Sequence, residues 1–95
     1  MQDNGKGMAE FKIPGNLKEF ALFSYPINHL EKKDKVRFYY ALKGRDGKSG
    51  IIKMYEIEQV ARGALIVPIS HKEDVASFLE GWGCKYEIRR VFLER

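Results

Sequence analysis

Cysteine is almost absent from this chain of 95 residues, which contains only Cys84. A single cysteine cannot form an internal disulfide, and the sequence does not open with a secretory signal peptide. No apolar run approaches the ~18 residues that span a bilayer. These absences predict a soluble protein of a reducing compartment, cytoplasmic or otherwise intracellular, with no membrane partner.

Side chains that perform catalysis or bind metals are also few. His29, His71 and Cys84 are isolated from one another and share no ligand spacing. The carboxylates of residues 73–80 follow the pattern of a helix start and a solvated helix face, and they suggest no acid–base pair. We therefore expect no metal, no cofactor and no enzymatic activity.

The glycine-rich stretch at residues 44–50 invites comparison with a phosphate loop. A phosphate loop ending at residues 47–49 needs a glycine at position 42, where this chain has Leu42, and a helix after it. Ile51 and Ile52 instead indicate a strand. We interpret the stretch as a flexible basic turn whose backbone amides can contact phosphate without specificity.

Positive charge is concentrated in one quarter of the chain. From Lys32 to Lys53 there are eight Lys or Arg residues and two Asp residues, a net charge of +6, whereas the whole chain carries +4. The remaining residues therefore sum to −2. Three of the five tyrosines lie in or beside this stretch. Cations for phosphates and flat rings for bases are what a nucleic-acid surface needs.

Residues 35–43 alternate with period two, which favours a half-buried strand. The two alternating sets are Val36, Phe38, Tyr40 and Leu42 against Lys35, Arg37, Tyr39, Ala41 and Lys43. Asp46-Gly47 is typical of a hairpin turn, and residues 50–57 return as the partner strand. A helix over the same residues is the alternative, because Asp34 suits its start and Gly44 its end.

The remaining segments indicate three strands and one helix. An apolar run at residues 19–25 predicts a strand, although Asn16 followed by Glu19 would also suit a short helix. Residues 64–69 form a continuous apolar run, as in a strand covered on both faces. Residues 86–93 predict a last strand, and its alternation slips at Arg89-Arg90 as at a bulge.

The helix at about residues 71–82 has the clearest pattern. Ser70 and Glu73 form a capping-box sequence, and Gly81 and Gly83 terminate the segment. Its apolar residues follow at i, i+3, i+4 and i+7, namely Val75, Phe78, Leu79 and Trp82.

These elements predict a single small α+β domain over residues 11–95, preceded by a flexible tail at residues 1–10. Its sheet is mainly antiparallel, with four or five strands, and the helix at about 71–82 backs it. If residues 35–43 were helical, the order would become the ferredoxin-like β-α-β-β-α-β.

On the hairpin interpretation, one sheet face presents cations around aromatic rings. The predicted nucleic-acid-binding residues are Lys35, Arg37, Tyr39, Lys43, Arg45, Lys48, Lys53 and Tyr55. We expect single-stranded DNA or RNA to be the partner, held by stacking and phosphate contacts. The alternative is a solvated strand whose Lys and Arg residues protect an edge from aggregation.

The same stretch resembles a PUR repeat and the wider PC4-like group of single-strand-binding domains. The resemblance rests on Arg37-Phe38-Tyr39, the basic glycine-rich turn, the segment IIKMYEI, the apolar strand and the amphipathic helix, over about residues 35–82. It implies a curved four-stranded sheet backed by a helix, and a homodimer. It also implies contacts on Arg37, Tyr39, Lys43, Lys48 and Lys53. The chain departs from the pattern in the short loop between the third and fourth strands, in the strand at 86–93 after the helix, and in its poorly defined first strand.

A protein-interaction or accessory subunit of a larger complex is the competing hypothesis. The basic segment would then contact an acidic protein, while Trp82, Tyr86 and Phe92 pack against a second copy. A helix at residues 35–43 would favour this hypothesis, because a helix separates the residues that a strand would place on one face.

Overall fold

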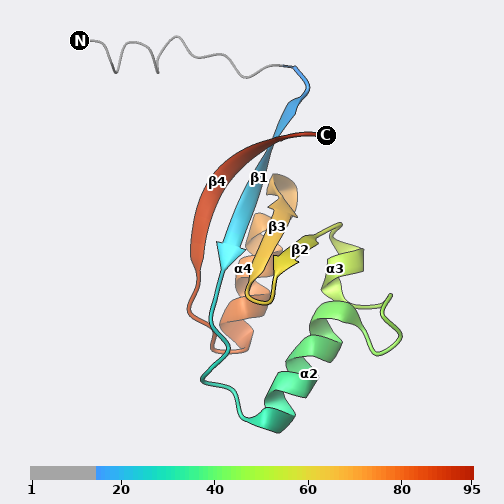
Figure 1. Ribbon diagram of the computed structural model, residues 1–95, viewed down its shortest axis with the longest axis vertical. Coiled ribbons are helices and arrows are strands. Elements are labelled where there is room, and N and C mark those ends of the chain that lie inside the picture. Colours follow the sequence, from blue (N-terminus) through green and yellow to red (C-terminus); the bar gives the residue numbers. More distant parts are fainter. Residues whose placement is uncertain (1–14) are drawn as a thin grey trace, which may run out of the picture.

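The computed structural model describes residues 15–95 (Figure 1). The tail that we predicted at residues 1–10 lies outside the described residues. The elements in chain order are β1 (Leu17–Ser24), α2 (Lys32–Lys43), α3 (Ile51–Met54), β2 (Glu58–Ala61), β3 (Ala64–Pro68), the 3-10 helix η1 (Ile69–His71), α4 (Lys72–Gly81) and β4 (Glu87–Glu94).

The four strands form one antiparallel sheet in the order β2-β3-β1-β4. With the short α3 as an addition, the element order is the ferredoxin-like β-α-β-β-α-β. The predicted α+β class, the antiparallel sheet and the helix at about 71–82 are confirmed. The topology is the one that the helical alternative for residues 35–43 predicts.

The core lies between the sheet and the two longer helices. Strand residues alternate between faces, so Ala21 and Phe23 of β1 point to the same side as Leu65 and Val67 of β3. All four belong to one buried cluster that also contains the inner faces of α2 and α4. The other face of the sheet carries no helix among the described residues, and Figure 1 shows α4 behind the sheet.

The strand prediction for residues 35–43 is wrong, because α2 covers them. The predicted apolar face should be buried throughout, yet Val36 is 45% exposed and Tyr40 43% exposed. Only Phe38 and Leu42 are fully buried. They are four residues apart and therefore lie on one side of a helix. The helix ends at Gly44, as expected, but begins after Glu31 rather than at Asp34.

The predicted return strand at residues 50–57 is also wrong. Residues 51–54 form α3, and the chain leaves it through Glu56, whose φ of 56° lies in the left-handed region. The N–H of Ile57 donates to the carbonyl of Ile52 at 2.9 Å, which closes this helix end. The chain then forms β2, a short edge strand that we did not predict.

The remaining expectations have mixed outcomes. The predicted strands at residues 19–25, 64–69 and 86–93 match β1, β3 and β4. The bulge predicted in the last strand is absent, because β4 pairs with β1 in an unbroken register. The capping box at Ser70 does not form either: η1 precedes α4, and its N-cap His71 makes no capping bond through its side chain.

Replacing Glu56 by glycine is expected to stabilise the fold. A side chain in the left-handed region is strained, so Glu56→Gly should raise the free energy of unfolding by about 0.5–1 kcal/mol. Ser77→Gly, in the exposed interior of α4, should lower it by a similar amount. Urea denaturation of both variants checks this, and a loss of stability in Glu56→Gly would contradict it.

Candidate nucleic-acid interface

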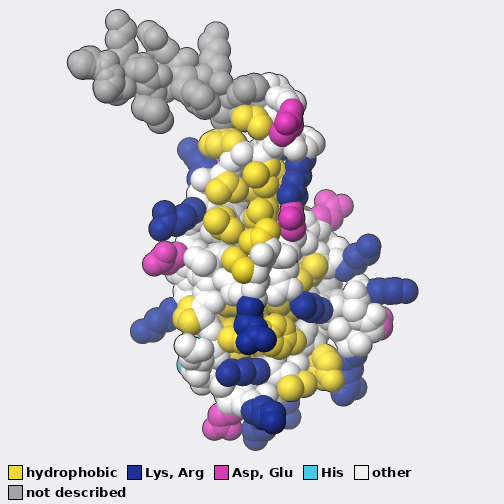
Figure 2. All heavy atoms as spheres, viewed as in Figure 1, with side chains coloured by type: hydrophobic (Ala, Val, Ile, Leu, Met, Phe, Trp, Pro, Cys, Tyr) yellow, Lys and Arg dark blue, Asp and Glu magenta, His cyan; other side chains and the backbone are white. Residues whose placement is uncertain are grey.

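The basic stretch is folded as helix α2, the loop at residues 44–50 and helix α3. Of its eight cationic side chains only that of Lys35 is half-buried, and the exposed ones are Lys32, Lys33, Arg37, Lys43, Arg45, Lys48 and Lys53. Within residues 15–95, none of the eight forms an ion pair with a carboxylate. Figure 2 shows many dark-blue and few magenta side chains over the lower half of the molecule, around α2.

The helix divides the predicted site into two stripes. Lys35, Tyr39 and Lys43 follow one another at i+4, so they lie along one side of α2. Arg37 lies on a different side, in line with the exposed Lys33. The predicted arrangement of all these residues on one strand face is therefore wrong, although their charges remain on the surface. A helix here is the outcome that we expected to favour the protein-interaction hypothesis, so the case for nucleic acid rests on the exposed charges.

The two tyrosines that we predicted as stacking platforms are engaged elsewhere. The hydroxyl of Tyr39 is buried and has no hydrogen-bond partner in the described structure. The ring of Tyr39 packs edge-on against Phe38, with centroids 5.8 Å apart. Tyr55 stacks on His71 with centroids 4.7 Å apart. The ammonium of Lys43 also lies over the Tyr39 ring, 5.9 Å from its centroid, so both rings already have partners within the fold.

Tyr40 is the exposed aromatic residue that the sequence interpretation missed. The strand pattern assigned it to the buried face, but its side chain is 43% exposed. The guanidinium of Arg45 lies over its ring, 4.9 Å from the centroid. This pair brings a cation and a flat ring together at the end of α2, where the helix enters the loop.

The loop at residues 44–50 forms a turn, as predicted, and its hydrogen bonds converge on Asp46. One carboxylate oxygen of Asp46 accepts hydrogen bonds from the backbone N–H of Lys48 at 2.8 Å and of Ser49 at 3.0 Å. It also accepts one from the Ser49 hydroxyl at 3.0 Å. These bonds hold the pKa of Asp46 below its usual range, the Lys48 amide contributing most. Both amides are therefore engaged within the loop.

A helix does follow this loop, which the sequence interpretation denied, but α3 has only four residues. Leu42 still replaces the glycine that a phosphate loop requires, and it is fully buried. Interpreting the loop as a nucleotide-binding site therefore remains unsupported. Its contribution to the surface is the exposed pair of cations Arg45 and Lys48.

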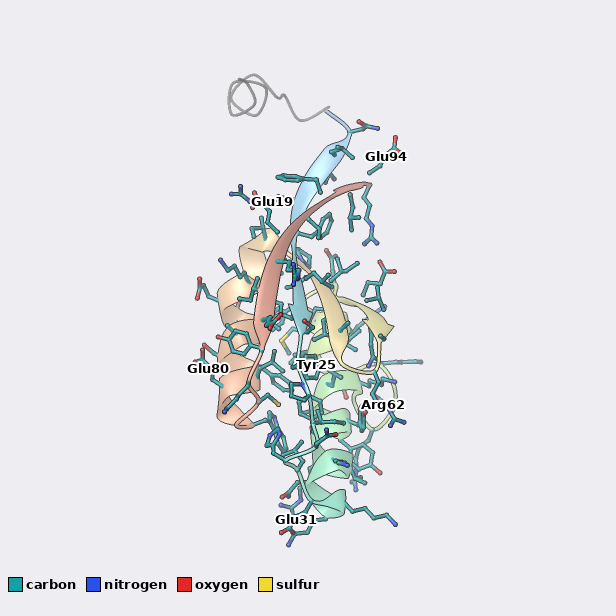
Figure 3. The ribbon with its side chains drawn as sticks, turned by 60° about the vertical axis from the view of Figure 1, so that its left-hand side comes forward. Glu19, Tyr25, Glu31, Arg62, Glu80 and Glu94 are labelled. Atoms are coloured by element: carbon teal, nitrogen blue, oxygen red, sulfur yellow. The ribbon has the colours of Figure 1, made fainter. Side chains whose placement is uncertain are left out.

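A shallow groove extends the basic surface onto the sheet edge. Tyr39 and Lys43 of α2 form one wall, and residues 59–62 of β2 and its turn form the other, around a volume of about 420 Å³. Arg62 is exposed at the turn between β2 and β3 (Figure 3). It lies outside the basic stretch in the sequence, so only the fold brings it beside Lys43.

A larger hollow lies at the end of the sheet but has no clear charge preference. Its volume is about 610 Å³, and its lining includes Tyr25, Lys85 and Glu87. The lining contains one cation and one carboxylate, so the hollow does not favour a polyanion. Among residues 15–95, no group of three or more His, Cys, Asp or Glu side chains is placed to hold a metal ion.

Comparisons with known proteins identify no relative. No family model matches the chain, and neither does any curated protein or solved structure. The segment that carries the resemblance to PUR repeats is helical over residues 32–43 and 51–54, so this resemblance does not help to locate a site. In the described part of the chain, no helix is long and apolar enough to span a membrane.

The shape of the loop is expected to depend on Gly50. A Cβ atom there would collide with the carbonyl of Leu42 and come 2.5 Å from the amide of Gly44. Gly50→Ala should therefore lower the free energy of unfolding by about 1–3 kcal/mol. Gly81→Ala, at a helical position with open space, should raise it by up to about 1 kcal/mol. Thermal unfolding distinguishes the two, and equal effects would contradict this account.

Removing the hydroxyl of Tyr39 is expected to stabilise the fold. Because this buried group has no partner, Tyr39→Phe should raise the free energy of unfolding by ~1 kcal/mol. Tyr86→Phe serves as the control, because the Tyr86 hydroxyl donates to Glu80 at 2.5 Å and its removal should be destabilising. Chemical denaturation measures both changes. A clear loss of stability in Tyr39→Phe would show that its hydroxyl has a partner.

Proposed function

We propose that this protein binds nucleic acid through the phosphate backbone, on a basic face formed by α2, the loop at residues 44–50 and Arg62. The observation that carries the proposal is the set of exposed cations on this face, none of which has a carboxylate partner within residues 15–95. Unpaired cations in such a number favour a polyanion, because each phosphate contact releases condensed counterions from the nucleic acid.

The scaffold beneath the charges supports the proposal further. Phe38 and Leu42 fix the inner side of α2 in the core, and the hydrogen bonds to Asp46 fix the loop. The positions of the cations are therefore set largely before a partner binds. A 12-residue helix is ~18 Å long, comparable to about five nucleotide steps of one strand.

The geometry supports backbone contact more than base stacking. Tyr39 and Tyr55 are engaged within the fold, and Tyr40 with Arg45 offers a single stacking position. A surface of this kind holds phosphates without reading sequence. We therefore expect single-stranded and double-stranded nucleic acid of equal charge to bind with similar affinity, in place of the single-strand preference that the hairpin implied.

The salt dependence of binding tests the proposal. Lys33→Ala/Arg37→Ala removes two exposed charges from the outer side of α2. Binding of a labelled oligonucleotide should weaken roughly tenfold to a hundredfold at low salt, and the slope of log K against log salt should fall by about 2. Fluorescence anisotropy over a salt series measures both quantities.

The matched control is Lys18→Ala/Lys72→Ala, which lowers the net charge equally but lies on β1 and at the start of α4. It should leave both affinity and slope almost unchanged. An equal loss of affinity in the two double variants would show that binding depends on total charge alone and not on this basic face. Absence of oligonucleotide binding at low salt, or equal binding of polyglutamate, would reject nucleic acid in favour of an acidic protein partner.

A further inference from the structure

Strand β4 forms one outer edge of the sheet. Its eight residues pair with β1 without interruption, from Glu87 opposite Ser24 to Glu94 opposite Leu17. No described element lies along its other side, and Figure 1 shows it running along the outside of the sheet. An edge of this kind leaves a row of backbone N–H and C=O groups available to another strand.

The two edges of the sheet differ in their protection. The opposite edge, β2, has four residues and an irregular register between Gln59 and Ala61, so it offers little to an incoming strand. β4 is twice as long and has no proline, glycine or bulge. Its protective devices are exposed charges, those of Glu87, Arg89, Arg90 and Glu94.

The side chains of β4 alternate between the two faces of the sheet. Val91 lies opposite Phe20, and Phe20 lies opposite Pro68, so these three form one apolar row on the face without helices. Figure 2 shows hydrophobic side chains gathered in a band over β1, β3 and β4. This row ends at the free edge, at the half-buried Val91.

We propose that two copies of this chain pair through β4, antiparallel, about a twofold axis at Val91. The pairing would produce a continuous eight-stranded sheet with all helices on one side. Each Val91 would face the other Val91, and the apolar row would continue from one copy into the next. The proposal does not depend on the basic face, which contains no residue of β4.

Charge favours this register over one with the axis at Arg90. With the axis at Val91, Glu87 lies opposite Arg95 of the second copy, and Arg90 lies opposite Phe92. Arg95 also contacts Glu58 of its own chain, and its side chain is 43% exposed. An axis at Arg90 would instead place the two Arg90 side chains opposite each other, which is unfavourable.

Registers with the axis between two residues are excluded, because a twofold axis through an antiparallel pair sets residues of the same sheet face opposite each other. They turn the helix-free face of one copy to the side on which the second copy carries its helices. The apolar row of Phe20 and Val91 would then end at the junction. An axis between Arg90 and Val91 would in addition place Glu87 opposite Glu94, two like charges.

Disulfide trapping tests the axis directly. Opposed residues of antiparallel strands have Cα atoms ~4.5–5.5 Å apart, which suits a disulfide. Val91→Cys should therefore form a covalent dimer under mild oxidation, seen on a non-reducing gel. Arg90→Cys should form at least tenfold less of the covalent dimer. The wild-type chain, whose single Cys84 is buried, provides the background.

Sedimentation equilibrium of the full chain supplies the second measurement. The wild type should associate to a dimer, and Val91→Lys, which opposes two like charges at the axis, should raise the dissociation constant at least tenfold. Circular dichroism confirms that each variant is folded. A wild type that stays monomeric at all concentrations would overturn the proposal. So would a dimer that Arg90→Cys traps better than Val91→Cys, or one that neither cysteine traps.

Discussion

The burial of Phe38 determines how the two halves of the molecule are joined. Its side chain is fully buried, and its ring lies 5.6 Å from those of Phe78 and Trp82 on or beside α4 and 5.8 Å from that of Tyr25. Phe38 thus ties α2 to α4 and to the segment after β1. Leu42, one turn later, continues the same inner side of α2. With this side in the core, the outer side of α2 must face water and can carry cations without desolvation.

The sequence was sufficient to predict the strands β1, β3 and β4 and the helix α4, but not the elements between residues 32 and 61. Residues 64–69 and 71–82 show unmistakable strand and helix patterns. Residues 35–43 contain apolar side chains at every second position, and a strand makes use of all of them. The helix uses only Phe38 and Leu42 and leaves Val36 and Tyr40 in solvent. No local pattern reveals which apolar residues the tertiary fold will leave exposed.

The edge strand β2 is a second element that the local sequence pattern does not reveal. Three of its four residues are exposed, so it lacks the alternation that marks a half-buried strand. Its conformation comes from pairing with β3, as in the pairs Glu58–Ile66 and Gln59–Leu65. The bulge expected at Arg89-Arg90 fails for a related reason. Both arginines stay exposed on an outer strand, so their polarity disturbs the sequence pattern without disturbing the backbone.

Charge and aromatic character also differ in how well they can be placed from sequence. Lys and Arg side chains remain at the surface in a strand or a helix, because burying them is costly, so the basic character of residues 32–53 was predictable. Tyrosine has no such constraint. Tyr39 turned its hydroxyl inward and Tyr55 packed against His71, whereas Tyr40, assigned to the core, is exposed. The cationic part of the candidate site therefore follows from sequence, and its aromatic part required the structure.

The sheet order places the basic face and the free edge on opposite sides of the molecule. The groove between Lys43 and Arg62 borders β2, and β4 lies at the far edge of the order β2-β3-β1-β4. Pairing through β4 would therefore leave both basic faces open, one at each end of an eight-stranded sheet. Two such faces on one particle bind a long polyanion with an effective local concentration that a single face lacks. Dimerisation through this edge would then strengthen binding to long chains while leaving binding to short oligonucleotides almost unchanged.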